Sequence, residues 1–194
     1  MSNIKLIVGL GNPGPEYQNT RHNAGAIFLE NLASHFNITL KYDAKFFGFC
    51  GRVTIAGNDI RLLIPTTYMN RSGQSVAAIA GFYKIQPSEL LVAFDELDFP
   101  PGVAKLKIGG SSSQNGIRDI VKSLANQEDF IRLRIGIGHP GDKSKVTGHV
   151  LSKAPNEQHN KMLLAIDHAI SCIPDLISSD FKTAQQKLHS FKAE

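Results

Sequence analysis

The sequence lacks most of the features that would assign it to a special class of protein. It contains no tryptophan and only two cysteines, Cys50 and Cys172, which stand too far apart for a metal or redox motif. We therefore expect both to be buried thiols in a reducing compartment. The N-terminus has no long apolar run and no cleavage signal, so we expect a cytoplasmic protein with no membrane contact.

Charge and hydropathy are equally moderate. Hydrophobic residues make up 42% of the 194 positions and charged residues 20%, which is ordinary for a globular chain and argues against disorder. Lys and Arg outnumber Asp and Glu by 21 to 17. This mild basic excess permits a nucleic-acid partner without requiring one. A chain of this length, without repeats or linkers, fits one domain with a real core.

Apolar periodicity and turn residues predict alternating strands and helices. We expect strands at residues 4–10, 90–96, 103–109 and 130–138, and a hairpin over 47–65 that turns at Gly57-Asn58-Asp59. Helices are expected at 24–36, 72–83 and 116–125, and over most of the chain from 156 onward. This alternation predicts a single three-layer α/β domain over residues 1–194, with a twisted, mixed but mainly parallel sheet flanked by helices.

Three glycines after the first strand raise the question of a nucleotide site. Gly9, Gly11 and Gly14 form the G-x-G-x-x-G pattern of dinucleotide-binding turns. That site requires a helix to begin inside the motif, so that its first amides meet the pyrophosphate. Here Pro13 and Pro15 interrupt the segment, and the helical pattern resumes only well beyond the glycines. The context therefore argues against a dinucleotide enzyme.

Polar side chains instead gather in the loops that follow the predicted strands. Open α/β sheets build their sites at this edge. A histidine can serve as a base near neutral pH, an aspartate can fix its tautomer, and carboxamides can stabilise an oxyanion. The pattern favours a hydrolytic site, and its members are Asn12, Tyr17, Thr20, Arg21, His22, Asn23, Tyr68, Met69, Asn70, Asp95, Glu96, Gln114 and Asn115.

Four segments in fixed order resemble the bacterial peptidyl-tRNA hydrolase family. They are GLGNPGPEYQNTRHNAG, TTYMNRSG, FDELDFPPG and RLRIGIGHPGD, and the resemblance runs from about Lys5 into the C-terminal helices. It implies hydrolysis of the ester between a peptide and the terminal ribose of tRNA, which recycles tRNA from aborted translation. It also implies one twisted α/β sheet with helices, no metal and no organic cofactor. The expected partner is peptidyl-tRNA, bound by a monomer that needs no protein partner.

The resemblance also implies residue roles. His22 matches the general base that activates water, and Asp95 matches the carboxylate that orients it. Amides that hold the peptide, the reacting carbonyl and the water match Asn12, Asn70 and Asn115, and residues lining the cleft match Tyr17 and Met69. Basic residues that contact tRNA phosphate match Lys105, Lys107 and Arg134. Residues 138–150 match a mobile flap over the cleft.

One segment departs from the family pattern. Where the family has glycines and a histidine before Asn-Gly, this chain has Ser112, Ser113 and Gln114, in a loop one residue shorter. Gln114 retains hydrogen-bonding groups but cannot titrate, and serines restrict a turn that glycines leave free. Glu96 takes the second place of the usual Asp-Asp pair.

Other interpretations of these residues stay open at this point. Asp95, Glu96 and Asp98 could bind a hard cation, although Glu96 and Asp98 are better explained as turn residues. Asn70 could serve only the turn before a helix capped by Ser72. The pair of lysines at 105 and 107 could be a solvated strand edge, as Lys143 and Lys145 are expected to be in the flap. The histidines without such partners are expected to be surface or packing residues, namely His35, His139, His149, His159, His168 and His189.

Two alternative functions remain beside the hydrolase. A non-catalytic RNA-binding module would keep the scaffold without turnover, and only the altered loop at 112–114 favours it. A dinucleotide oxidoreductase is a distant third, which bound cofactor absorbance would reveal.

Overall fold

A computed structural model describes residues 3–191 and 193. Its strands are β1 (Leu6–Gly9), β2 (Lys41–Asp43), β3 (Gly48–Ile55), β4 (Asn58–Pro65), β5 (Leu90–Glu96), β6 (Ala104–Ile108) and β7 (Ile131–Gly136). Its helices are α1 (Ala24–His35), α2 (Ser72–Tyr83), α3 (Asn115–Ser123), α4 (Val146–Val150), α5 (Asn156–Ser178) and α6 (Phe181–His189). Two short 3₁₀ turns also matter for the site, η2 (Arg21–Asn23) and η4 (Met69–Arg71).

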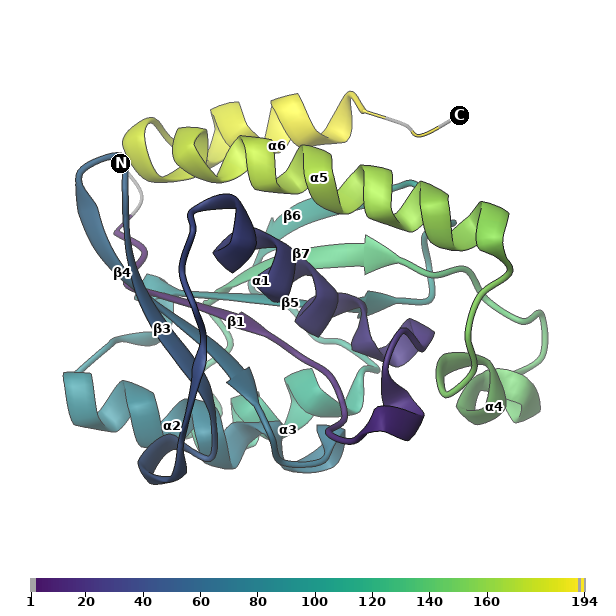
Figure 1. The fold of residues 1–194 in the computed structure, drawn as a ribbon, viewed down its shortest axis with the longest axis horizontal. Coiled ribbons are helices and arrows are strands. Elements are labelled where there is room, and N and C mark those ends of the chain that lie inside the picture. Colours follow the sequence, from purple (N-terminus) through teal and green to yellow (C-terminus); the bar gives the residue numbers. More distant parts are fainter. Residues whose placement is uncertain (1–2, 192, 194) are drawn as a thin grey trace.

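The strands form one mixed sheet in the order β2-β3-β4-β1-β5-β7-β6. The four central strands, β4, β1, β5 and β7, run parallel, whereas β2, β3 and β6 add antiparallel pairs at the two sides. Every residue of β1 and β5 is buried, as expected for central strands covered on both faces. Because the parallel strands end at one edge, the loops after them meet there (Figure 1).

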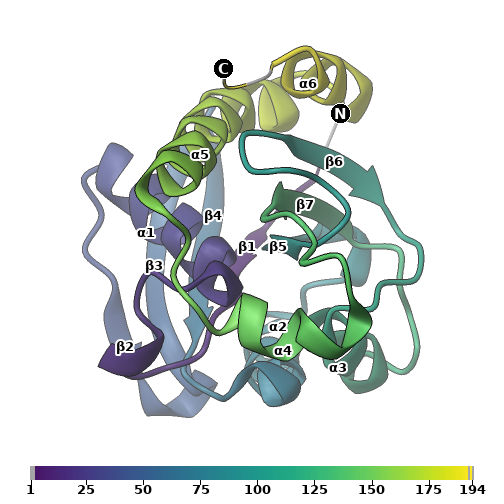
Figure 2. The ribbon, with the colours of Figure 1, turned by 90° about the vertical axis from the view of Figure 1, so that its right-hand side faces the viewer.

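Helices cover both faces of the sheet. Helices α1, α5 and α6 pack on one face around Phe28, Leu29 and Ile166, and α2 and α3 pack on the other around Val76 and Ile117 (Figure 1). Figure 2 looks onto the edge where the parallel strands end, with α4 in front of it. The predicted three-layer α/β domain with a twisted mixed sheet is confirmed.

Close packing explains why glycines follow β1. A Cβ on Gly9 would collide with the backbone oxygen of Gly25, and a Cβ on Gly25 would collide with the backbone oxygen of Ala93. Helix α1 therefore lies unusually near β1 and β5. Gly14, with φ of 107°, turns the loop that follows. Since α1 begins only at Ala24, the glycines do not open a helix, and the structure agrees with the argument against a dinucleotide site.

Two local expectations were wrong. The β3–β4 hairpin turns at Ala56-Gly57, with φ of 49° and 79°, because Asn58 and Asp59 already pair with Ile55 and Thr54. Cys172 is buried as expected, but Cys50 is only half-buried on β3. Desolvation is nevertheless the largest effect on that thiol, and with nearby Asp43 it raises the pKa of Cys50 to about 11.

The helices are short or amphipathic rather than continuously apolar. Within residues 3–191 and 193, none is long and apolar enough to cross a membrane.

Candidate active site

The loops at the ends of the parallel strands enclose a cavity of about 330 Å³. The loop after β1 supplies Asn12 and the turn η2. The turn η4 follows β4, and β5 contributes its last two residues, Asp95 and Glu96. The start of α3 and helix α4 complete the wall. The lining residues are Asn12, His22, Tyr68, Met69, Asn70, Asp95, Glu96, Leu97, Ser113, Gln114, Asn115, Val146, Thr147, Val150 and Leu151.

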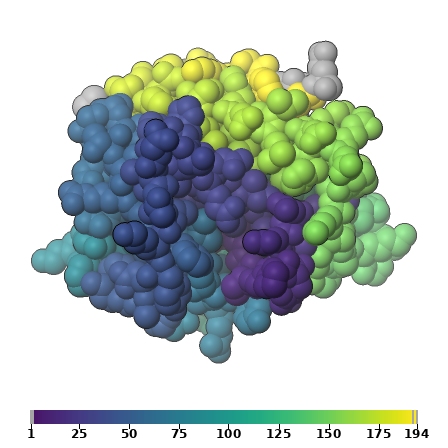
Figure 3. Space-filling view, viewed as in Figure 1, coloured from purple at the N-terminus to yellow at the C-terminus, as the bar shows by residue number. Residues whose placement is uncertain are grey.

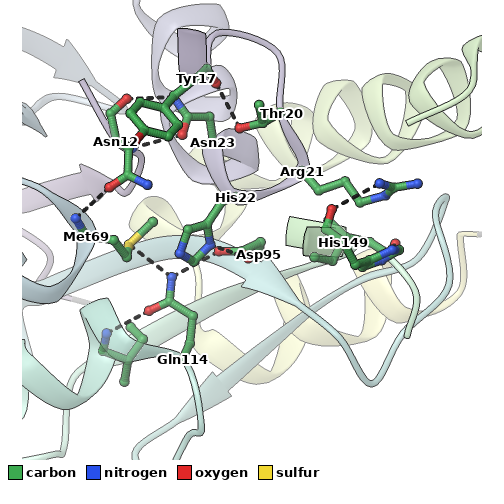
Figure 4. Close-up of polar contacts among 12 residues, drawn as sticks. Asn12, Tyr17, Thr20, Arg21, His22, Asn23, Met69, Asp95, Gln114 and His149 are labelled. Carbon is green, nitrogen blue, oxygen red and sulfur yellow. Dashed lines mark hydrogen bonds and ion pairs between the residues drawn. The ribbon is translucent and has the colours of Figure 1, made fainter. Parts of the chain in front are cut away.

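His22 and Asp95 form a hydrogen-bonded pair within this cavity. Nδ1 of His22 lies 2.7 Å from Oδ2 of Asp95, and the two side chains are 12% and 2% exposed (Figure 4). Because Asp95 only accepts, Nδ1 carries the proton of the neutral imidazole and Nε2 is left as the base. No hydrogen bond occupies Nε2 within the described part of the chain. The arrangement suits abstraction of a proton from a group held in the cavity.

Opposing effects set the protonation of this histidine. Burial is the largest and by itself lowers the pKa of His22, since it disfavours the charged ring. The negative charge of Asp95 and its hydrogen bond act the other way and together prevail, so the pKa of His22 is raised above its usual 6.5. Asp95 thus makes His22 a stronger base while fixing its orientation.

Gln114 holds the other oxygen of Asp95. Its Nε2 donates to Oδ1 at 2.9 Å and lies 3.1 Å from the sulfur of Met69 (Figure 4). Its Oε1 accepts from the backbone N–H of Ile117 at 2.9 Å, so the same carboxamide also caps α3. The residue that departs from the family pattern is therefore firmly tied into the site.

Asn12 is held by Met69 and Asn23, and its side-chain NH₂ group, bonded to none of the described residues, remains free to donate. Its Oδ1 accepts from the backbone N–H of Met69 at 2.7 Å. Its backbone N–H and C=O bond the side chain of Asn23 at 2.8 and 3.0 Å. These contacts fix the carboxamide so that its NH₂ group turns toward the space beside His22 (Figure 4). Asn12 can therefore donate to an oxygen in the cavity.

The remaining cleft residues differ in how they meet the cavity. Asn70 and Asn115 are exposed and line it, from η4 and from the first position of α3. Met69 lines it while remaining buried. Tyr17 packs edge-to-face against Tyr68, with ring centres 6.4 Å apart, and Tyr68 is the ring that lines the cavity.

The predicted phosphate-binding residues come from two paired strands. Lys105 on β6 lies opposite Arg134 on β7, and both cations stand over the ring of Phe99, at 4.9 and 4.5 Å from its centre. Lys107 is exposed one pleat further along β6. Glu96 accepts from Nε of Arg134 at 2.7 Å and also lines the cavity. The basic group therefore adjoins the site, and part of the charge of Arg134 is paired.

The segment 138–150 ends in α4, where Val146, Thr147 and Val150 line the cavity. Nε2 of His149 bonds the carbonyl of Gly138 at 2.9 Å, which joins the two ends of the segment. Arg21 donates to the carbonyl of His149 at 3.0 Å (Figure 4). It also donates to the hydroxyl of Ser152 at 2.6 Å. Figure 3 shows the purple loop around η2 lying against the green segment. Its mobility stays a prediction, and Lys143 and Lys145 are exposed as expected.

The carboxylates at the end of β5 contact other groups of the protein. Glu96 is engaged by Arg134 and by the backbone N–H of Asp98. Nowhere in residues 3–191 and 193 do three His, Cys, Asp or Glu side chains gather closely enough to hold a metal ion.

The sequence signals for several of these contacts were weak or were misread. Ser72 does not cap α2 through its side chain, because its hydroxyl donates to the carbonyl of Met69. The sequence places Asn23 and Arg21 beside His22 without predicting a role for either, and the structure shows Asn23 bound to Asn12 and Arg21 bound to His149. The sequence marks Gln114 only as a departure from the family pattern, whereas in the structure it contacts Asp95 directly. Local sequence patterns cannot predict contacts such as those of Arg21 and Gln114, because the partners are far apart along the chain.

Known proteins resemble the chain over its whole length. The peptidyl-tRNA hydrolase family model matches residues 6–194. A peptidyl-tRNA hydrolase of Pseudoalteromonas atlantica is 66% identical over 194 residues, which is all of both chains, and one of Pseudomonas putida is 58% identical over the same extent. The crystal structure of peptidyl-tRNA hydrolase from Acinetobacter baumannii superposes with a TM-score of 0.95 at 54% identity, covering 99% of this chain and 97% of that one. The chain, with its histidine–aspartate pair set among carboxamides at the end of a parallel sheet, belongs to the peptidyl-tRNA hydrolase family.

Proposed function

We propose that the protein hydrolyses the ester between peptide and tRNA in peptidyl-tRNA, with His22 as the general base. The observation that carries this proposal is the 2.7 Å contact of His22 Nδ1 with Asp95, which leaves Nε2 facing a cavity lined by three asparagines. Family membership supports the choice of substrate, and the geometry supports the role proposed for each group.

The reaction begins with a water molecule between Nε2 of His22 and the ester carbonyl. Nε2 takes one proton as the water oxygen bonds to the carbonyl carbon, and Asp95 stabilises the imidazolium that forms. The carbonyl oxygen becomes an oxyanion, for which the NH₂ group of Asn12 is a donor, with Asn70 and Asn115 nearby. General-base catalysis of this kind is typically worth about 10²–10⁴-fold in rate.

Collapse of the tetrahedral intermediate breaks the bond between the carbonyl carbon and the ribose oxygen. The proton held by His22 passes to that oxygen, which leaves as the free hydroxyl of tRNA, and the peptide leaves as a carboxylic acid. One water is consumed and His22 returns to its starting state. No covalent link to the protein is required.

We further propose that Lys105, Lys107 and Arg134 contact phosphates of the tRNA acceptor stem. The position of Lys105 and Arg134 around Phe99, next to the cavity through Glu96, supports this assignment. The solvated-edge alternative remains for Lys107, which is exposed at the strand face. Translation supplies the substrate, so we place the protein in the cytoplasm, acting as a monomer without a cofactor or a protein partner.

The deciding experiment is incubation with an N-acetylated aminoacyl-tRNA and measurement of free tRNA released. Wild type should turn over the substrate, and His22→Ala should lose roughly 10²–10⁴-fold in kcat while still binding tRNA. The matched control is His35→Ala, since His35 is exposed at the far end of α1. Tight tRNA binding by wild type without any release would favour the non-catalytic RNA-binding module, and an active His22→Ala variant would remove the base assignment.

A further inference from the structure

The side chain of Gln114 is fixed at both ends of its carboxamide. The nitrogen donates to Oδ1 of Asp95 at 2.9 Å, and the oxygen accepts from the N–H of Ile117 at 2.9 Å. An amide with its oxygen committed to a helix end has only its NH₂ group to offer the carboxylate. The direction of the bond to Asp95 is therefore set by the start of α3.

We propose that Gln114 is a positioning residue of the hydrolysis, which fixes the rotation of the Asp95 carboxylate so that Oδ2 stays on His22. The inference deepens the proposed function and rests on it. Gln114 acts through Asp95 and His22, and it needs no contact with the reacting ester.

The burial of Asp95 explains why such a donor matters. Its side chain is 2% exposed, so water is largely excluded and each oxygen depends on protein donors. His22 supplies a donor to Oδ2, and Gln114 supplies one to Oδ1. Without Gln114 the carboxylate could turn about its Cβ–Cγ bond, and Oδ1 would be left buried without its donor. A carboxylate that turns no longer holds Nδ1 of His22 in one tautomer.

A carboxamide performs this task without adding an ionisation. The ionisable side chains that line the cavity around it are His22, Asp95, Glu96 and Tyr68, and Glu96 is paired with Arg134. Gln114 donates to Asp95 without itself gaining or losing a proton, since an amide stays neutral. A histidine in this place, as the family usually has, would titrate beside Asp95 near neutral pH. The acid limb of activity should therefore follow a single ionisation in this chain.

Three substitutions separate positioning from helix capping. Gln114→Met keeps the length of the side chain and its contact with Met69, but removes both the donor and the cap. Gln114→Asn restores a favourable cap residue that is one methylene too short to reach Asp95. Gln114→His restores a donor that can titrate. Gln74→Met, on an exposed position of α2, is the control for the chemical change alone.

The readouts are kcat and KM against pH on a short substrate, an N-acetylated amino acid esterified to a single nucleotide. We expect Gln114→Met and Gln114→Asn to lose roughly 10- to 100-fold in kcat, the equivalent of one hydrogen bond to a charged group. KM should stay near wild type in Gln114→Asn, because the cap keeps Asn115 in place. Gln114→His should recover most of kcat and add a second ionisation to the profile of kcat/KM.

The tautomer of His22 provides a readout that needs no turnover. In ¹⁵N spectra of the imidazole, wild type should show the proton on Nδ1, and Gln114→Met and Gln114→Asn should show both tautomers in exchange. Wild-type kcat in Gln114→Asn with loss only in Gln114→Met would overturn the proposal in favour of capping. Equal loss in all three Gln114 variants, with one tautomer throughout, would also overturn it. A wild type that releases no tRNA would instead count against the proposed function, and the spectra would still decide the role of Gln114.

Discussion

Asp95→Asn tests the site most sharply, because the surroundings dictate how the new amide would sit. Gln114 presents an NH₂ group to one side of residue 95 at 2.9 Å, and its own oxygen is committed to Ile117. The introduced amide must therefore turn its oxygen toward Gln114 and its NH₂ group toward His22. Nδ1 of His22 then has to accept, and the ring proton moves to Nε2, where the base is needed.

The expected loss in kcat is about 10²–10⁴-fold, which is the whole contribution of general-base catalysis, because a histidine protonated on Nε2 cannot act as the base. It should not exceed the loss in His22→Ala. The pKa of His22 should also fall below its usual 6.5, because burial lowers it and the carboxylate that outweighed burial is gone. The acid limb of kcat/KM should accordingly move to lower pH than in wild type.

The assay is kcat/KM on the short nucleotide ester between about pH 5 and pH 8, the range in which a histidine titrates. Adding Gln114→Met to Asp95→Asn should restore part of the rate, since the introduced amide is then free to turn over. An Asp95→Asn enzyme within a few-fold of wild type, with its acid limb unmoved, would refute the assignment of Asp95 as the group that orients His22.

Three other perturbations test tRNA binding, the chemical mechanism and the packing of the fold. Lys105→Ala and Arg134→Ala should raise KM on full-length peptidyl-tRNA and lower the salt slope by roughly one unit each, and Lys105→Ala should leave the short substrate unaffected; equal impairment of Lys105→Ala on both substrates would place Lys105 in the cleft or the fold instead. Exhaustive chelation should leave hydrolysis of the short ester unchanged, whereas loss that zinc or manganese restores would revive a metal mechanism. Gly25→Ala should lower the free energy of unfolding by about 1–3 kcal/mol or more, because its Cβ meets the backbone of Ala93; a denaturation midpoint equal to wild type would contradict the close packing of α1.

The sequence predicts the strands and helices because their apolar periods are strong and because β1 and β5 are buried on both faces. It misplaces the hairpin turn because Ala56 adopts the left-handed conformation that residue preferences assign to Asn and Gly. His22 and Asp95 could be paired in advance, since each lies in a segment whose pattern is specific. Their distance of 2.7 Å depends on strand register, which local pattern does not carry.

Gln114 shows the limit of reasoning from residue type. Compared with the family's glycines and histidine, Gln114 is the loss of a titratable group, and from sequence alone this loss favours a site with weakened or no activity. The structure instead makes it a donor to Asp95 and the cap of α3. Glu96 is a second residue whose contact is hidden in the sequence. Its extra methylene relative to aspartate suggests only a mild change, whereas it binds Arg134, 38 residues further along the chain. Neither contact could be found without the fold.

The position of Arg21 beside His22 limits which sequence changes this part of the chain can accept. Arg21 binds His149, at the end of segment 138–150, and Ser152 just beyond it, and the next residue in the same 3₁₀ turn is His22. A single peptide unit thus links the proposed base to the residue that binds the end of segment 138–150. An insertion or deletion in η2 would disturb both at once, whereas residues 139–145, between two joined ends, can change in sequence without moving His22. The substitutions that this region tolerates should therefore fall mainly within residues 139–145.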